Sequence, residues 1–372
     1  MNNDKKEALY QEEENEPFSD SVDSLEFRKE KKVYSICIIF LPILITILIL
    51  SIIIYFIIKE PVDSKQKDIT EEKTRDEIKD KFNYTIKERI EVFQNDSKPI
   101  LLFNDHFTNL KDNILSIKVN NKTIDKIENY YNFNKIGNYF IEIMFNKKLK
   151  SMQEMFIDCK DIVELDLSDV DTSKVQSMKS AFSGCNKLRI INLENFNTSL
   201  VTDMSYMFSE CHCLTSLNLD NFDTSLVQDM SHMFQNSSRL EYVNVSSFNT
   251  QNVYKMNFMF NLCNLTTLDV SNFKTVKVIY IQYMFSYCGT LTSLNISNFD
   301  TSEVVDFSGL FKGNKNLDNI DISKLYTDKM NTYNDMFLYL PKNGIITFNM
   351  KTHLRILNQI PDDWQKIRYI DE

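Results

Sequence analysis

A phenylalanine recurs at nearly constant spacing along much of this 372-residue chain. Six of the seven intervals between successive members are 26 residues long and one is 25. The repeat phenylalanines are Phe156, Phe182, Phe208, Phe234, Phe260, Phe285, Phe311 and Phe337. A period of this length is typical of stacked repeat architectures, so it decides the fold class before local secondary-structure preferences are considered.

Each repeat phenylalanine follows apolar residues that stand seven, four and one positions before it; before Phe208 these are Val201, Met204 and Met207. Residues with this spacing lie on one face of a helix, so the pattern predicts a short helix in every repeat. Thr-Ser pairs precede these segments, and Ser173 with Gln176 fits the S-x-x-Q capping box. We therefore expect hydroxyl side chains to cap the helices.

A second pattern, L-x-x-L-x-L-x-x-F, precedes each of these segments, for example LTSLNLDNF from Leu214. Its period of two predicts a short strand with polar residues facing outward. A unit of strand, turn and short helix is too small to bury its own apolar face, so the units must stack. The predicted fold is an α/β repeat solenoid of short parallel strands and short helices over residues 149–340.

The single 25-residue interval comes from a shortened corner. Two residues separate Cys185 from Leu188, whereas one residue separates Cys263 from Leu265. The missing residue falls in the turn between the predicted helix and the next strand. We expect the solenoid to absorb the deletion there.

Residues 33–58 form a run of 26 residues without a charged side chain. A helix of this length spans about 39 Å at ~1.5 Å per residue, more than the roughly 30 Å hydrocarbon core of a bilayer. A cleaved signal peptide has a shorter apolar region, and a buried helix of a soluble domain is not apolar on every face. The basic residues from Arg28 to Lys32 favour a type II signal anchor, with residues 1–32 as an acidic, disordered cytoplasmic tail.

Residues 59–100 begin with a densely charged run and are interpreted as a stalk. In the second half of this segment, Ile78, Phe82, Ile86 and Ile90 recur every four residues, which predicts one amphipathic helix. A disordered linker is the alternative for the first half of the stalk.

Caps are expected at both ends of the array, because an open solenoid end would expose its core. The alternation from Tyr139 to Phe145 predicts a strand within an N-terminal, strand-rich cap at residues 101–148. Asn343-Gly344 followed by IITF predicts a turn and a strand within a C-terminal cap at residues 341–372.

Sequences of the type Asn-X-Ser/Thr occur eight times, all of them after the apolar run. Such sequons accept N-linked glycans in secreted chains, so their placement favours repeats that face the cell exterior or a lumen. The candidate glycosylation sites are Asn83, Asn95, Asn121, Asn197, Asn236, Asn244, Asn264 and Asn295.

The repeat resembles that of the BspA-like leucine-rich-repeat surface proteins, a 26-residue repeat also found in mycoplasma lipoproteins. The motif that carries the resemblance is L-x-x-L-x-L-x-N-F-[DN]-T-S-x-V-x-x-M-x-x-M-F-x-x-C, and Leu214 through Phe234 match it nearly in full. The resemblance covers about residues 149–340. It implies a right-handed, leucine-rich-repeat-like solenoid on a cell surface, with a recognition or adhesion role and no catalysis. The family's bacterial modes of attachment do not carry over to a chain with this anchor.

Stacking would align equivalent strand positions in columns about 4.8 Å apart, and two of these columns would line the exposed face of the sheet. We predict this face to be the ligand surface, since repeat proteins bind through such faces. The alternative is a solvated Asn/Asp ladder without a ligand. The candidate residues are Glu164, Asp166, Ile190, Asn192, Ser216, Asn218, Tyr242, Asn244, Thr267, Asp269, Ser293, Asn295, Asn319 and Asp321.

Ile190 and Tyr242 are the strongest contact candidates on this face, because exposed apolar and aromatic side chains contribute most to binding. Two other members, Asn244 and Asn295, are also sequons. Glycans at these positions would obstruct the face. Either those sequons are unused, or the ligand surface lies elsewhere.

Five cysteines form another column, each three residues after its phenylalanine: Cys159, Cys185, Cys211, Cys263 and Cys288. Neighbouring members could bridge in an oxidising compartment. Buried free thiols that pack as small apolar groups are the favoured interpretation, because Ser237 fills the same position in one repeat. Cys211, His212 and Cys213 lack further ligands at a spacing suited to zinc, so no metal site is predicted.

Charge and composition narrow the function. Residues 151–340 carry 13 basic and 22 acidic side chains, which disfavours nucleic acid and anionic lipid headgroups as ligands. No glycine-rich nucleotide-binding motif and no catalytic set is present in the sequence, so neither a cofactor nor an enzymatic activity is predicted. The predicted function is a membrane-anchored cell-surface protein that recognises or adheres to an unknown protein or glycan. The alternatives are a structural surface coat or an intracellular membrane scaffold built by self-association of the repeats.

Overall fold

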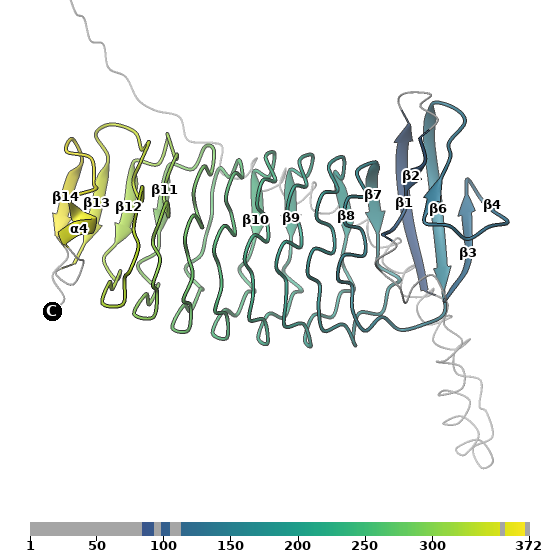
Figure 1. Ribbon diagram of the computed structural model, residues 1–372, viewed down its shortest axis with the longest axis horizontal. Helices are drawn as coiled ribbons and strands as arrows, with labels where there is room; N and C mark the ends of the chain where they lie inside the picture. The colour runs from purple at the N-terminus through teal and green to yellow at the C-terminus, as the bar shows by residue number, and fades with distance from the viewer. Residues whose placement is uncertain (1–83, 93–97, 105–112, 350–353, 369–372) are drawn as a thin grey trace, which may run out of the picture. The chain divides into compact units, whose positions relative to one another are not determined.

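The computed structural model describes residues 84–92, 98–104, 113–349 and 354–368 (Figure 1). The predicted tail at 1–32 and membrane helix at 33–58, like the sequons Asn83 and Asn95, lie outside these residues. Within the described ranges, no helix has the length and hydropathy that a membrane crossing requires.

An antiparallel sheet precedes the repeats. Its strands, in the spatial order β4-β3-β6-β1, are β1 (Tyr84–Val92), β3 (Ile114–Val119), β4 (Lys122–Thr123) and β6 (Gly137–Phe145). A short pairing also joins β2 (Ile100–Leu101) to β5 (Tyr130–Tyr131). The predicted strand from Tyr139 to Phe145 is confirmed. Asn120 and Asn121 have φ values of 49° and 65°, the left-handed pair that a two-residue hairpin turn requires.

The helix predicted for the second half of the stalk is wrong where the structure describes it. Residues 84–92 form β1, which joins the cap to the repeats by pairing with both β6 and the first repeat strand. Ile86 and Ile90 are fully buried on the same side of this strand. Residues four apart share a face in a strand as well as in a helix, so the spacing could not distinguish the two.

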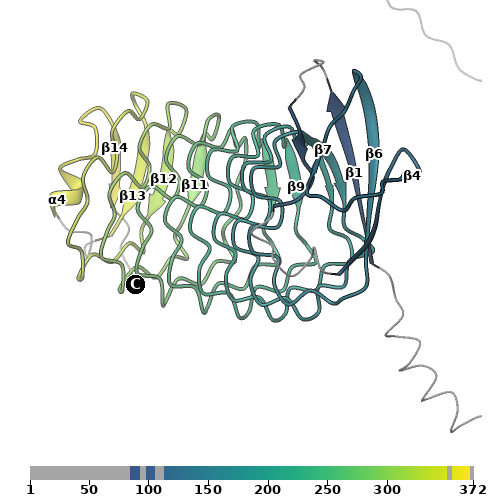
Figure 2. The ribbon, with the colours of Figure 1, turned by 45° about the vertical axis from the view of Figure 1, so that its right-hand side comes forward.

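The strands predicted in the repeats form in all but one of them. They are β7 (Ile162–Asp166), β8 (Ile190–Asn192), β9 (Ser216–Asn218), β10 (Tyr242–Asn244), β11 (Ser293–Asn295) and β12 (Asn319–Ile322). Where neighbours pair, they do so in parallel and at equivalent positions, for example Val243 beside Leu217. Successive turns of the solenoid, here called rungs, follow one another in sequence order in both views (Figures 1 and 2).

The C-terminal end continues the parallel sheet past the last repeat. β13 (Ile345–Phe348) and β14 (Gln365–Arg368) extend it in the order β11-β12-β13-β14, and a one-turn helix, α4 (Leu354–Leu357), lies between them in sequence. The predicted IITF strand is therefore confirmed. Trp364 is buried, and its indole N–H donates to the carbonyl of Pro341 at 2.8 Å.

The short helix predicted in every repeat is wrong. Each of these segments is instead a run of tight turns in which the residues two before and two after the repeat phenylalanine have φ values between 53° and 79°. Around Phe208 these residues are Tyr206 and Glu210. Such left-handed residues cannot continue an α-helix. They cost ~1–2 kcal/mol each for any residue other than glycine, and glycine occupies three of the sixteen positions.

Hydrogen bonds between rungs offset this cost. Phe208 N–H donates to Met233 C=O at 2.8 Å, and Phe234 N–H donates to Met259 C=O at 2.9 Å, with the same pattern along the array. The intervening amides close tight turns, as Met207 N–H does onto Met204 C=O at 3.3 Å. Such turns return every third residue to the interior, which is why the apolar spacing imitated a helix.

The threonines of the Thr-Ser pairs also join rungs instead of capping helices. Thr224 is fully buried; its hydroxyl donates to Asn249 C=O at 3.1 Å and accepts Asn249 N–H at 2.7 Å. Equivalent donor bonds run from Thr172, Thr198, Thr250, Thr275 and Thr301 to the following repeat.

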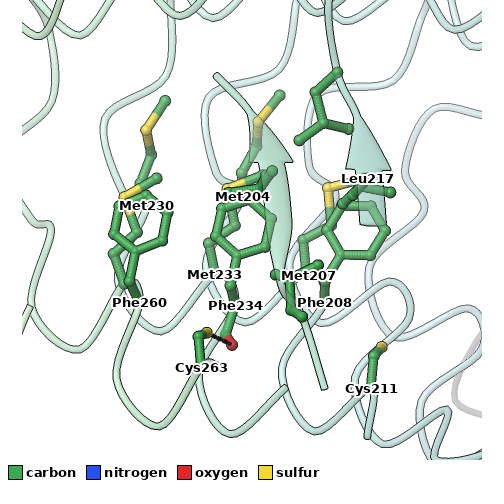
Figure 3. Packing of buried hydrophobic residues seen from close by; sticks show 14 of the residues in the cluster. Met204, Met207, Phe208, Cys211, Leu217, Met230, Met233, Phe234, Phe260 and Cys263 are labelled. Carbon is green, nitrogen blue, oxygen red and sulfur yellow. Dashed lines mark hydrogen bonds between the residues drawn. The ribbon is translucent and has the colours of Figure 1, made fainter. Parts of the chain in front are cut away.

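The core is a continuous stack of side chains. The rings of Phe208, Phe234 and Phe260 lie nearly parallel, with centroids 6.0 and 5.5 Å apart, and methionines fill the space beside them (Figure 3). These three phenylalanines are fully buried. The predicted solenoid is therefore confirmed, although its rungs contain turns where helices were expected.

The column cysteines are buried free thiols, as favoured from the sequence. Each thiol donates to a carbonyl of the preceding rung or, for the first, of residue 102; Cys263 Sγ lies 3.0 Å from Phe234 O (Figure 3). Ser237 makes the equivalent bond to Phe208 O at 2.7 Å, which explains why serine serves in this position. Burial raises the pKa of Cys211 to about 12.

One carboxyl group lies in the core without a partner. Glu88 in β1 is 2% exposed, and neither of its carboxylate oxygens has a hydrogen-bond partner in the described part of the chain. Burial raises the pKa of Glu88 well above its ordinary value.

Phe234→Ala is expected to destabilise the chain by about 3–5 kcal/mol, because it leaves a cavity in the middle of the stack. Tyr254→Ala, at a side chain that is 41% exposed, serves as the matched control and should change stability by less than about 0.5 kcal/mol. Urea unfolding curves measure both. Equal effects of the two substitutions would contradict a continuous aromatic core.

Iodoacetamide at pH 8 should alkylate Cys213, which is half-buried and off the column, while the five column thiols stay unmodified until urea is added. The reagent attacks the thiolate, and the raised pKa keeps a thiol such as Cys211 protonated. Peptide mass spectrometry identifies which cysteines are alkylated. Rapid modification of the column in the native protein would show that it is accessible.

Glu88→Gln should raise stability at neutral and alkaline pH. The folded chain holds its Glu88 proton at a pH where the unfolded chain has lost it, so wild-type stability falls as pH rises from about 4.3 toward the raised pKa. The glutamine side chain does not titrate, so the difference in the free energy of unfolding between variant and wild type should grow from pH 4 to pH 8. Thermal melts across this range test the difference, with the exposed Glu241→Gln as control. A constant offset would refute the assignment.

Candidate ligand-binding face

The structure aligns most of the predicted ligand residues in two columns on the strand face. Parallel pairing places Glu164 beside Ile190 and Asp166 beside Asn192, with the buried Leu165 between the columns pointing inward. The same register places Tyr242 beside Ser216. Thr267 and Asp269 belong to the one repeat that forms no strand, so no ladder holds them in line with their neighbours.

One column has a structural role in every repeat. The side-chain oxygen of its Asn or Asp accepts the N–H two residues later, at 2.8–3.2 Å, and so closes a turn at the end of the strand. The residues are Asp166, Asn192, Asn218, Asn244, Asp269, Asn295 and Asp321. Asparagine and aspartate interchange along the column because this Asx turn needs only the oxygen that both possess.

At the N-terminal end of the face, the acidic candidates are engaged by β1. Arg89 forms ion pairs with Glu164 and Glu91, and Lys87 lies 3.8 Å from the Asp166 carboxylate. Burial acts to raise the pKa of Asp166, but hydrogen bonds from Ser168 and the charge of Lys87 outweigh it, so the pKa is lowered. Glu164 and Asp166 thus hold the cap on the array.

Ile190 and Tyr242 are the most exposed apolar side chains among the candidates, at 58% and 49%. Each lies in the wall of a depression on the strand face. The depression beside Ile190 has a volume of about 460 Å³ and also includes Arg189, Glu194 and Asp220. The depression beside Tyr242 has a volume of about 330 Å³ and includes Thr267, Asp269 and Ser293.

Both depressions coincide with interruptions of the strand ladder. Among the described strands, β8 does not pair with β9, and β10 does not pair with β11. The first gap has no explanation in the repeat pattern. The second contains residues 265–270, the repeat whose corner is one residue short.

The shortened corner accounts for this second gap. In other rungs the leucine that opens the strand donates its N–H to the column residue three before it, as Leu188 does to Cys185 at 3.1 Å. Leu265 follows Cys263 after a single residue and cannot close that turn. The backbone groups of Thr267 and Leu268 have no backbone partner within the described chain, and Leu268 is only partly buried. The deletion therefore opens the sheet without breaking the core, since Phe260 and Phe285 still stack at 6.0 Å.

Sequence reasoning missed an aromatic column on the turn side. The rings of Tyr206, His232, Phe258 and Tyr283 stack with centroids 4.2, 4.8 and 4.9 Å apart. These residues stand two positions before their repeat phenylalanines and have left-handed φ values. The sequence could have revealed the column, because an aromatic residue occupies this position in four consecutive repeats. Their faces cover one another, so the column presents mainly ring edges to solvent.

Ring spacing differs between the aromatic columns of the solenoid. It is 4.2–4.9 Å in the turn-side column, but 6.3 Å between Phe196 and Phe222 and 6.4 Å between Phe248 and Phe273, just after the strands. The turn side also has an unbroken ladder of single bridges from Ser177 to Thr332. The bridges keep successive rungs paired along the turn side, whereas the strand ladder is interrupted at the two depressions.

The described sequons divide by exposure. Asn121, Asn197 and Asn295 are exposed, whereas Asn236, Asn244 and Asn264 are partly buried. Asn244 also donates its amide to Asp220. A glycan on Asn295, in β11, would lie on the strand face.

Comparison with known proteins places the repeats in a family. The family described as "Mycoplasma protein of unknown function, DUF285" matches residues 150–267, 214–293 and 263–351, which together cover more than half of the chain. Comparison with curated proteins and with solved structures found no match. The finer resemblance to BspA-like surface proteins stays a prediction. The chain belongs to the DUF285 family of repeat-containing proteins, whose function is unknown.

Proposed function

We propose that this chain is a membrane-anchored cell-surface protein that recognises a partner through the strand face of its solenoid, without catalysis. The apolar run at 33–58 supports the anchor, and the sequons after it support display outside the cell. The single observation that carries the recognition role is the coincidence of both depressions with the candidate residues Ile190 and Tyr242.

The chemistry of the face supports binding more than reaction. Its carboxylates close turns or pair with basic residues, as Asp269 does with Ser271 N–H at 2.9 Å and Glu164 does with Arg89. Within the described residues, no group of three or more His, Cys, Asp or Glu side chains is placed to hold a metal ion. What the face offers instead is exposed apolar side chains beside hydroxyl and carboxamide groups in shallow concavities.

A structural coat is the second candidate, favoured by apolar side chains exposed away from the strand face. Tyr254, Leu262 and Tyr280 are 41%, 42% and 40% exposed, and they lie in or beside the turn segments. Lateral association of copies would bury them. Light scattering of the purified chain at rising concentration should then show growing assemblies, whereas a recognition protein stays at constant mass.

Topology on living cells tests the proposal. The full-length chain with a C-terminal epitope tag should be labelled by antibody on intact cells, and endoglycosidase should increase its gel mobility. A tag at the N-terminus should be labelled only after permeabilisation. A C-terminal tag hidden until permeabilisation, on a chain that endoglycosidase does not shift, would instead support an intracellular scaffold.

A further inference from the structure

We infer that the depression at the shortened repeat binds a neutral saccharide. The inference rests on the proposed function, because it names the ligand class for the strand face. The depression lies between β10, residues 265–270 and β11, where the sheet is open. Its volume of about 330 Å³ is at the small end of the ~300–1,000 Å³ typical of small-molecule sites.

Tyr242 supplies the apolar wall. Its side chain is 49% exposed, and its column neighbours Ser216 and Thr267 are too small to cover a ring. In the described chain, Tyr242 takes part in none of the ring stacks that bury other aromatic side chains. An exposed, uncovered tyrosine ring offers the apolar surface against which the C–H face of a sugar ring packs, with a polar tip beside it.

The rest of the lining supplies hydrogen-bonding groups that suit the hydroxyls of a sugar. Thr267 and Ser293 contribute hydroxyls, and the backbone of Thr267 and Leu268 contributes amide and carbonyl groups that lack a backbone partner in the described chain. Asp269 uses one carboxylate oxygen for its turn with Ser271, which leaves the other for a ligand hydroxyl. Hydrogen bonds from Ser271 lower the pKa of Asp269, so this group is a charged acceptor at neutral pH.

The charge of the lining selects the ligand class. No lysine or arginine lines the depression, and Asp269 is the one carboxylate in it. A phosphate, a sulfated sugar or a sialic acid would meet this carboxylate without a compensating cation. A single partly solvated carboxylate also contributes little to holding a basic peptide. By contrast, the depression beside Ile190 has charges of both signs and no aromatic ring.

Binding is measured with the purified full-length chain in mild detergent. The probes are methyl glycosides of neutral hexoses and N-acetylhexosamines and neutral linear oligosaccharides, followed by saturation-transfer NMR and calorimetry. Sialylated and sulfated oligosaccharides and a lysine-rich peptide serve as competing ligand classes. We expect binding of at least one neutral saccharide and none of the charged ligands.

The chain itself supplies matched variants. Asp269→Asn keeps the Asx turn, since asparagine closes the same turn in four other repeats, but removes the charged acceptor. Asp321→Asn makes the same change outside the depression. Tyr242→Ala removes the ring, and Tyr254→Ala removes a tyrosine of comparable exposure elsewhere, 41% against 49%. Affinity should fall about tenfold or more in the first member of each pair and stay unchanged in the second.

A third variant tests the origin of the site. Inserting a lysine between Asn264 and Leu265 restores the Cys-Asn-Lys-Leu corner found at Cys185–Leu188. It should close the strand ladder, slow hydrogen exchange at the Thr267 and Leu268 amides, and abolish saccharide binding in a folded chain.

The inference is overturned if no neutral saccharide binds the wild type, or if binding survives both Asp269→Asn and Tyr242→Ala. Preference for the lysine-rich peptide would likewise replace the saccharide with a protein partner. Because these assays use purified protein, their failure leaves surface display untouched. A negative topology experiment would in turn leave a measured saccharide site intact.

Discussion

Hydrogen bonding between rungs is the constraint on which this structure depends. A single 26-residue repeat contains a three-residue strand and a series of tight turns, and neither satisfies its own backbone. The amides of alternate residues around Phe208 and Phe234 find acceptors only in the next repeat. Each such bond contributes ~0.5–1.5 kcal/mol net, and each would leave a buried amide unpaired if the neighbour were absent. Apolar burial sets which side of the rung faces inward, and these bonds set the distance between rungs.

The same constraint explains the composition. Within one rung, Asn218, Asp223 and Asp229 each accept the N–H two residues later, at 3.2, 2.9 and 2.9 Å, and so close three of its corners. Asn and Asp are suited to this because their side chains imitate a backbone carbonyl. The chain therefore needs few glycines, although each rung contains two left-handed residues. Two of the sequon asparagines, Asn244 and Asn295, also close corners of this kind.

The repeat period, the inward-facing residues and the strand positions could be predicted, because each follows from a regular apolar spacing. The conformation of the turn segments could not. Apolar residues three and four apart fit a helix and a chain of tight turns equally well. A left-handed φ value also cannot be read from the sequence when a residue other than glycine, such as Tyr206 or His232, adopts it. β1 was missed for a related reason, since Ile86 and Ile90 share a face in either structure. The two ligand columns followed from register alone, but the two breaks in the sheet did not, because they depend on how far each strand lies from the next.

The shortened corner connects these points to function. A perfect array presents the same surface at every rung, so no single rung would bind a small ligand differently from the others. Removing one residue after Cys263 leaves the phenylalanine stack and the turn-side ladder continuous, because neither depends on that corner. Only the strand pairing at residues 265–270 is lost, next to the rung that carries Tyr242 on the strand face. The loss of the ladder at this strand leaves the stacked core in place and coincides with the depression beside Tyr242. A departure from the repeat is thus tolerated at the position where it has most effect on the surface, which is where a binding site in such a fold is expected to arise.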